Sequence, residues 1–124
     1  MPETPREIDR LIPLPPAGEP HAALADGRGD LAASLLRELP HLCPLTAVSS
    51  PLWRCYDLWG YEELMVRALS RPELVEHACR RFEQVDLHWI ALVAALGAEV
   101  VWIEECFTDG ISPALFARTN LPFL

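Results

Sequence analysis

Several features that would place the chain in a broad functional class are missing. There are 10 basic residues against 18 acidic ones, a formal net charge of −8, whereas nucleic acids and anionic membranes require clustered Lys and Arg. We therefore expect neither kind of partner.

The longest strongly apolar run covers only residues 89–96, far short of the roughly 20 residues that cross a bilayer. The opening MPETPREIDR has no apolar signal-peptide core, so we expect a cytoplasmic protein.

Closely spaced cysteines are also missing. Cys43, Cys55, Cys79 and Cys106 include no C-x-x-C pair, which argues against a zinc knuckle built from them. In a cytoplasmic protein these four thiols are expected to be reduced.

Prolines mark the N-terminal part of the chain. Six of the 12 prolines lie within the first 20 residues, which predicts that residues 1–29 form a mostly irregular segment and that residues 30–124 form the folded part. A helix is predicted over residues 31–39, with Asp30 as its N-cap. A strand over residues 42–48, an aromatic-rich loop over residues 52–59 and a helix over residues 61–69 are predicted to follow.

The second half of the chain carries the clearest pattern. Ser70 and Glu73 have the spacing of a capping box, and the apolar repeat beyond them predicts a helix over residues 72–96 that ends at Gly97. A β-branched strand is predicted over residues 98–104. Two strands joined by a helical crossover predict a parallel pair. We therefore assign the chain to the α/β class, as part of a TIM (β/α)8 barrel, because a complete barrel needs roughly 250 residues.

Candidate functional residues follow the second strand, since barrel enzymes carry their chemistry at the C-terminal ends of the strands. We expect Glu104 to face the barrel mouth, with Val101 and Ile103 facing the helices; the opposite register would place Glu105 at the mouth. Cys106 and Asp109 come next. Ser112 and Pro113 are then predicted to cap and begin the next helix.

The segment after the first strand supplies the other candidates: Ser50, Trp53, Arg54 and Tyr56. Aromatic side chains with polar tips suit the wall of a pocket for a large flat ligand, and Arg54 is a candidate partner for a ligand carboxylate. The alternative is that the tryptophans of this segment only pack it onto the barrel.

In this order, these segments resemble the uroporphyrinogen decarboxylase superfamily, which includes corrinoid-linked methyltransferases. The resemblance runs from about Pro40 to Pro122. It rests on SSPLW, GYEELM, RPELVEHACRRF, ALGAEVVWIEEC, ISPALF and NLPFL. It implies a TIM barrel with a deep pocket at its mouth.

The resemblance also implies roles for individual residues. Tyr56 is the nearest match to a substrate-contacting tyrosine of the decarboxylases, and Cys106 stands where they have a pocket-lining serine. Glu104, Glu105 and Cys106 replace their usual Phe-Asp-Ser. Our catalytic candidates are Glu104 and Tyr56. Our substrate-binding candidates are Ser50, Trp53, Arg54, Cys106 and Asp109.

Three functions are compatible with this resemblance. The first is decarboxylation of a tetrapyrrole carboxylate, or a divergent relative of that reaction. The second is corrinoid-dependent methyl transfer, which implies a methyl donor, a corrinoid protein partner and zinc in the full-length protein. We assign no metal ligand or cofactor to this segment, because His41-Leu42-Cys43 lies at the wrong end of a strand. The third is an inactive, truncated fragment, and formation of a homo-oligomer stays open.

Overall fold

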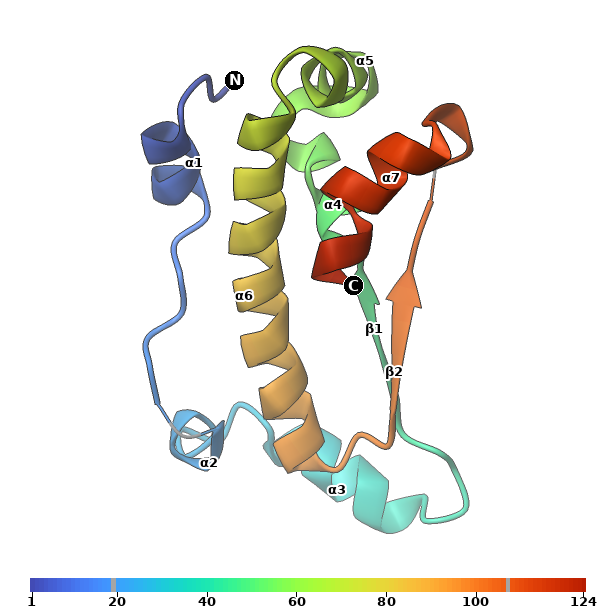
Figure 1. Cartoon of the computed structure of the whole chain (residues 1–124). Coiled ribbons are helices and arrows are strands. Elements are labelled where there is room, and N and C mark those ends of the chain that lie inside the picture. Colours follow the sequence, from blue (N-terminus) through green and yellow to red (C-terminus); the bar gives the residue numbers. More distant parts are fainter. Residues whose placement is uncertain (19, 107) are drawn as a thin grey trace.

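A single long helix, α6 (Pro72–Leu96), runs along the molecule (Figure 1). The computed structural model describes residues 1–18, 20–106 and 108–124. The bounds of α6 are those predicted from the apolar repeat. Pro72 fits in the first turn because its missing N–H costs nothing there. Gly97 ends the helix with a φ of 107°, a left-handed conformation that favours glycine.

The sheet consists of two parallel strands, β1 (Leu45–Ser49) and β2 (Val100–Glu104), joined through α6. Leu45 pairs with Val100 at one end and Ser49 with Glu104 at the other. The α/β class and the parallel pairing are confirmed. Both strands begin two or more residues later than predicted. Just ahead of the pairing, the Pro44 carbonyl accepts hydrogen bonds from the amides of Glu99 and Val100.

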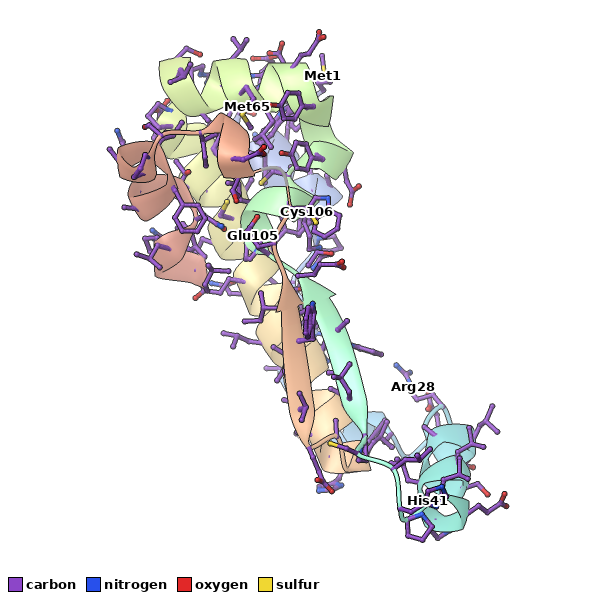
Figure 2. The ribbon with its side chains drawn as sticks, turned by 90° about the vertical axis from the view of Figure 1, so that its right-hand side faces the viewer. Met1, Arg28, His41, Met65, Glu105 and Cys106 are labelled. Atoms are coloured by element: carbon purple, nitrogen blue, oxygen red, sulfur yellow. The ribbon has the colours of Figure 1, made fainter. Side chains whose placement is uncertain are left out.

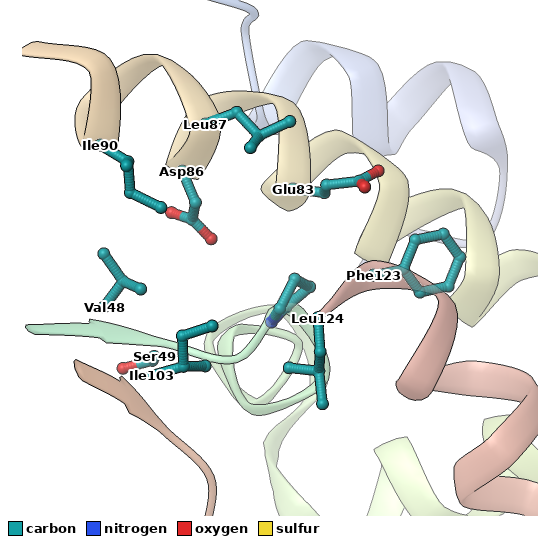
Figure 3. A pocket seen from close by; sticks show the side chains of 10 residues that line it. Val48, Ser49, Glu83, Asp86, Leu87, Ile90, Ile103, Phe123 and Leu124 are labelled. Atoms are coloured by element: carbon teal, nitrogen blue, oxygen red, sulfur yellow. The ribbon is translucent and has the colours of Figure 1, made fainter. Parts of the chain in front are cut away.

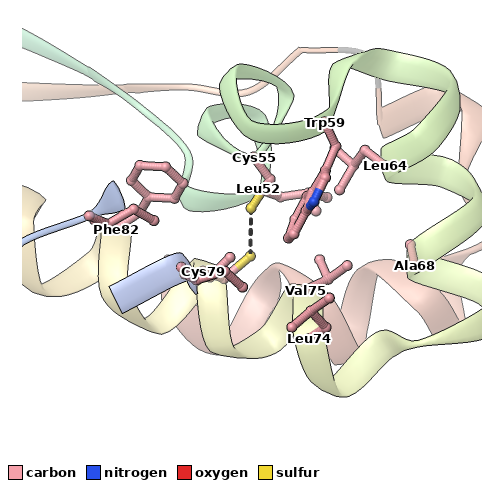
Figure 4. Close-up of a cluster of buried hydrophobic side chains, with 12 residues drawn as sticks. Leu52, Cys55, Trp59, Leu64, Ala68, Leu74, Val75, Cys79 and Phe82 are labelled. Carbon is pink, nitrogen blue, oxygen red and sulfur yellow. Dashed lines mark hydrogen bonds between the residues drawn. The ribbon is translucent and has the colours of Figure 1, made fainter. Parts of the chain in front are cut away.

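The hydrophobic core lies among the helices and away from the sheet. It is enclosed by α1 (Pro5–Leu11), α4 (Pro51–Arg54), α5 (Tyr56–Ser70) and the first half of α6. Figure 4 shows how the α4 and α5 side chains meet those of α6. The buried residues of this core are Ile8, Ile12, Leu52, Cys55, Trp59, Leu64, Ala68, Leu74, Val75, Ala78, Cys79 and Phe82.

Most of the N-terminal segment lies outside helices and strands, but it also contains α1 and α2 (Pro20–Ala23), which were not predicted. Thr4 and Glu7 form a capping box at the start of α1, a signal that was present in the sequence as T-x-x-E. Ile8 is completely buried and Ile12 nearly so. Residues 1–12 therefore belong to the same core as the helices that follow β1.

The prediction of a loop over residues 52–59 was wrong, because this segment is helical. The Ser50 hydroxyl accepts a hydrogen bond from the Trp53 amide at 3.1 Å and caps α4, with Pro51 in its first turn. Within α5, Gly60 has a φ of 71° and kinks the helix. The helix predicted over residues 61–69 is the part of α5 after this kink.

Two of the predicted helix caps did not form. Asp30 lies inside α3 (Asp30–Glu38), and Gly29 occupies the N-cap position. Ser70 is the last residue of α5, and its hydroxyl donates back to the Val66 carbonyl at 2.7 Å, so it does not occupy the N-cap position of α6. Arg71 is the N-cap of α6 instead.

The predicted Ser112 cap did form. Its hydroxyl accepts a hydrogen bond from the Leu115 amide at 3.2 Å and starts α7 (Pro113–Thr119). The short helices η1 (Thr108–Gly110) and η2 (Leu121–Phe123) flank α7. Over the described residues, we find no helix with the length and apolarity to span a membrane.

Candidate functional site

The C-terminal ends of the two strands meet, and the candidate residues lie around them. The Ser50 amide donates to the Glu104 carbonyl at 2.9 Å, one residue beyond the last strand pair. Figure 2 shows Glu105 and Cys106 at this end and His41 at the opposite end. Ser50, Glu104 and Cys106 therefore lie at the same end of the strands, as predicted, and His41 lies far from them.

The register of β2 agrees with the sequence prediction. Ile103 pairs with Val48, and both line a cavity together with Leu87 and Ile90 of α6. The residues on either side of Ile103 therefore point to the other face of the sheet. Glu104 is exposed, as is Trp102 with an exposed fraction of 56%. No helix of the described chain lies over this face (Figure 2).

Glu105 has very different surroundings from Glu104. It is half-buried, and its Oε2 accepts a hydrogen bond from Nδ2 of Asn120, which is completely buried. Asn120 was not predicted, because it lies 15 residues further along and reaches Glu105 only when α7 folds back. Of the two neighbouring carboxylates, Glu105 is the one held in place by the protein.

Two tyrosines lie beside this pair. The rings of Tyr56 and Tyr61 stack with their centroids 5.9 Å apart. Burial raises the pKa of the Tyr56 hydroxyl, and the acidic neighbours Tyr61, Glu105, Asp109 and Cys106 raise it further. Tyr56 therefore keeps its proton to more alkaline pH than an ordinary tyrosine, and it lies near three of the residues that follow β2.

The turn after β2 packs against these rings. A Cβ atom at Gly110 would lie only 2.6 Å from the Tyr61 hydroxyl, so the η1 turn approaches the ring closely. Tyr61 was not among the predicted site residues. Its position after the Gly60 kink brings it back toward Tyr56, and the helix pattern alone did not show this.

Arg54 is paired within the chain. Its guanidinium forms an ion pair with Asp86 of α6 and lies 4.4 Å from the centre of the Phe82 ring. Burial raises the pKa of the Asp86 carboxyl, and the positive charge of Arg54 opposes that shift. The predicted partner for a ligand carboxylate thus already has a carboxylate partner within the chain.

The cavity behind the strand ends is small. It measures about 80 Å³ and lies between α6, the strands and η2, with the Asp86 side chain directed toward the strands (Figure 3). Pockets for drug-sized ligands are typically about 300–1,000 Å³, so this cavity cannot enclose a large flat ligand. Among the residues that the structure describes, no group of three or more His, Cys, Asp or Glu side chains is arranged to hold a metal ion.

Comparison with known proteins gives a distant and partial match. The chain is 26% identical over 102 residues to "Uroporphyrinogen decarboxylase" from Xanthomonas axonopodis pv. citri and from Xanthomonas euvesicatoria pv. vesicatoria, and 24% identical to that of Xanthomonas campestris pv. campestris. Each match covers 77% of this chain and 29% of the relative. The chain therefore spans less than one third of the length of these curated relatives.

No family model matches the chain. A search of the solved structures also gives no significant match. The similarity to the Xanthomonas proteins agrees with the resemblance seen in the sequence motifs. Together they indicate a distant, partial relationship to the uroporphyrinogen decarboxylases.

Proposed function

We propose that this chain forms part of the mouth of a uroporphyrinogen decarboxylase-like TIM barrel, which removes a carboxylate from a tetrapyrrole or catalyses a divergent form of that reaction. One observation carries the proposal. A parallel strand, helix, strand unit brings Glu104, Glu105, Cys106 and Tyr56 to one end, and its sequence is similar to the decarboxylases.

In this proposal, Tyr56 is a hydrogen-bond donor to the substrate. Its phenol is protonated at neutral pH and the raised pKa extends this to more alkaline pH, so it can donate to a substrate carboxylate. Glu104 or Glu105 stabilises positive charge on a protonated pyrrole. Ser50, Trp53, Cys106 and Asp109 line the substrate pocket. The rest of the barrel supplies the arginines that bind the other substrate carboxylates, because Arg54 is paired with Asp86.

A chimeric enzyme tests the proposal. The segment of the Xanthomonas axonopodis decarboxylase that aligns with this chain is replaced by the chain's own residues, and decarboxylation of uroporphyrinogen is measured. We expect a folded chimera with measurable activity. Tyr56→Phe should lower kcat/KM by about tenfold or more, the effect of losing a hydrogen bond to a charged group.

The matched control is Tyr61→Phe, which removes a hydroxyl from the stacked neighbouring ring and should leave kcat/KM nearly unchanged. A folded chimera without activity would support the inactive-fragment alternative. Equal effects of the two substitutions would remove the specific role of Tyr56.

Corrinoid-dependent methyl transfer is the second candidate. The observation that favours it is the acidic pair Glu104–Glu105 in place of the usual Phe-Asp of the decarboxylases. In this reading zinc is bound by residues of the full-length protein outside this segment, and a corrinoid protein docks at the mouth. Zinc analysis of the full-length protein separates the two candidates: one bound zinc per chain favours methyl transfer, and its absence favours decarboxylation.

A further inference from the structure

Two oxygen atoms in the candidate site lack a partner in the described chain. Asn120 donates through Nδ2 to Oε2 of Glu105. This hydrogen bond does not involve the other oxygen of each side chain, Oδ1 of Asn120 and Oε1 of Glu105. Both atoms are shielded from solvent, and neither has a hydrogen-bond partner among the described residues. Amide and carboxylate oxygens accept hydrogen bonds, and burying an acceptor without a donor is unfavourable. The pair therefore has two acceptor positions for a donor group.

The surrounding elements hold Asn120 in a fixed position. It follows α7, and its backbone amide donates to the Phe116 carbonyl at 3.0 Å. Arg118 ties α7 to α6 through Glu76 at 2.6 Å, and the buried Thr119 hydroxyl bonds back to the Leu115 carbonyl. Because Nδ2 points to Glu105, the direction of the Asn120 carbonyl is also set.

The charges around the pair are negative. Glu104 precedes it in the chain, and Asp109 lies in the η1 turn close enough to act on Tyr56 together with Glu105. Arg54, which comes after β1 at the same end of the strands, is paired with Asp86. This environment favours a cationic group over an anionic one. It does not suit a metal ion, because no set of three or more ligating side chains is present among the described residues.

We propose that Glu105 and Asn120 form a binding subsite for a positively charged N–H donor, such as an ammonium group, on a ligand that enters at the C-terminal ends of the strands. One N–H donates to Glu105 Oε1 and a second donates to Asn120 Oδ1. This subsite rests in part on the proposed function, in which Glu104 or Glu105 meets a protonated pyrrole. Its test needs neither decarboxylase nor methyl-transfer activity, so the two proposals can fail separately.

The chain offers a selective probe, because Asn120 is its only asparagine. Protein labelled with ¹⁵N-asparagine gives a single side-chain amide signal, which is followed during titration with methylammonium chloride. We expect a saturable shift. Tetramethylammonium chloride at equal ionic strength, which has the charge but no N–H, should leave the signal in place.

Substitutions then locate the effect. Glu105→Gln preserves the shape of the side chain and should weaken methylammonium binding by about tenfold, because the hydrogen bond to a charged acceptor is lost. Glu99→Gln removes the same charge at the other end of β2 and should leave binding unchanged. Thermal unfolding provides a second measurement that can be used even if the NMR signal of the Asn120 amide is broad. Methylammonium should raise the melting temperature of the native chain, and tetramethylammonium should not.

Three results would overturn the proposal. One is an equal response to the two ions, which would indicate charge screening. Another is no response to either ion, as expected if a structural water satisfies both oxygens. The last is unchanged affinity in a folded Glu105→Gln variant.

Discussion

The helices around α6 enclose a set of almost fully buried side chains, whereas every residue of β2 is exposed. Both regions are rich in apolar residues, so composition does not explain the difference. The helices have neighbours on the sides that carry their apolar groups. The sheet has α6 on one face only, and its other face presents Leu45 and Trp102 to solvent with exposed fractions of 57% and 56%.

This difference shows which part of the chain folds on its own contacts. Parallel sheets in α/β proteins are normally covered on both faces, and the open edges and faces of strands favour association. We infer that the helical region supplies the stability of the isolated chain. The sheet has the surface that further barrel strands, or another molecule, would cover.

The largest expected effect comes from breaking the helical region. Leu64→Ala empties a completely buried position on α5 and should lower the free energy of unfolding by about 2–5 kcal/mol, measured by urea denaturation with circular dichroism. Leu69→Ala makes the same change on the same helix at a position that is 77% exposed, and should cost less than about 0.5 kcal/mol. Similar losses in the two variants would contradict the location of the core.

A smaller effect is expected on the sheet. The isolated chain should be inactive and oligomeric, aggregated or only marginally folded, because its open face is apolar. Trp102→Thr should weaken self-association by about tenfold or more, because the free energy of burying one large apolar side chain corresponds to at least that change in affinity. The measurement is size-exclusion chromatography with light scattering over a range of concentrations.

Trp89→Thr is the control for this experiment, since Trp89 is also half-exposed but lies on α6. If the native chain were a soluble monomer with a sharp cooperative melt and decarboxylase or methyl-transfer activity, the fragment hypothesis would be abandoned.

The smallest effect concerns the attachment of the N-terminus to the helices. The Arg67 guanidinium holds the pKa of the Glu3 carboxyl below its ordinary value of 4.5. Because the folded-state pKa is the lower one, the stabilisation is present above about pH 4.5 and is lost as the pH falls through the lowered pKa. Glu3→Gln should therefore lower the melting temperature modestly at pH 7, and this difference should shrink below pH 4.5.

Glu62→Gln, at an exposed carboxylate on α5, is the matched control and should lower the melting temperature at pH 7 less than Glu3→Gln does. A Glu3→Gln difference that persisted unchanged at low pH would argue against the ion pair as its cause.

The parts of the fold that the sequence predicted depend on local signals. Pro72 and Gly97 bound an apolar repeat, and they gave α6 its correct limits. The parallel pairing followed from the crossover rule for two strands joined by a helix. The same local signals misled at Ser70, because α5 continues through this residue and the N-cap of α6 falls on Arg71. The T-x-x-E signal at Thr4 was overlooked in a segment dominated by proline.

The candidate site could be predicted only in outline. The strand ends were located correctly, so Ser50, Glu104 and Cys106 lie where expected. The bonds between Glu105 and Asn120 and between Arg54 and Asp86 join residues 15 and 32 positions apart. They depend on how α7 and α6 pack, which no periodicity in the sequence encodes.

The attachment of α1 has a consequence for the order of folding. The partners of the first 12 residues lie far along the chain: the Trp59 indole bonds to the Pro2 carbonyl, 57 residues away, and Arg81 bonds to the Ile12 carbonyl, 69 residues away. Closing such long loops is entropically costly and slows folding. We therefore expect the N-terminus to dock after α5 and α6 have met, and Trp59 is positioned to report its arrival in a refolding experiment.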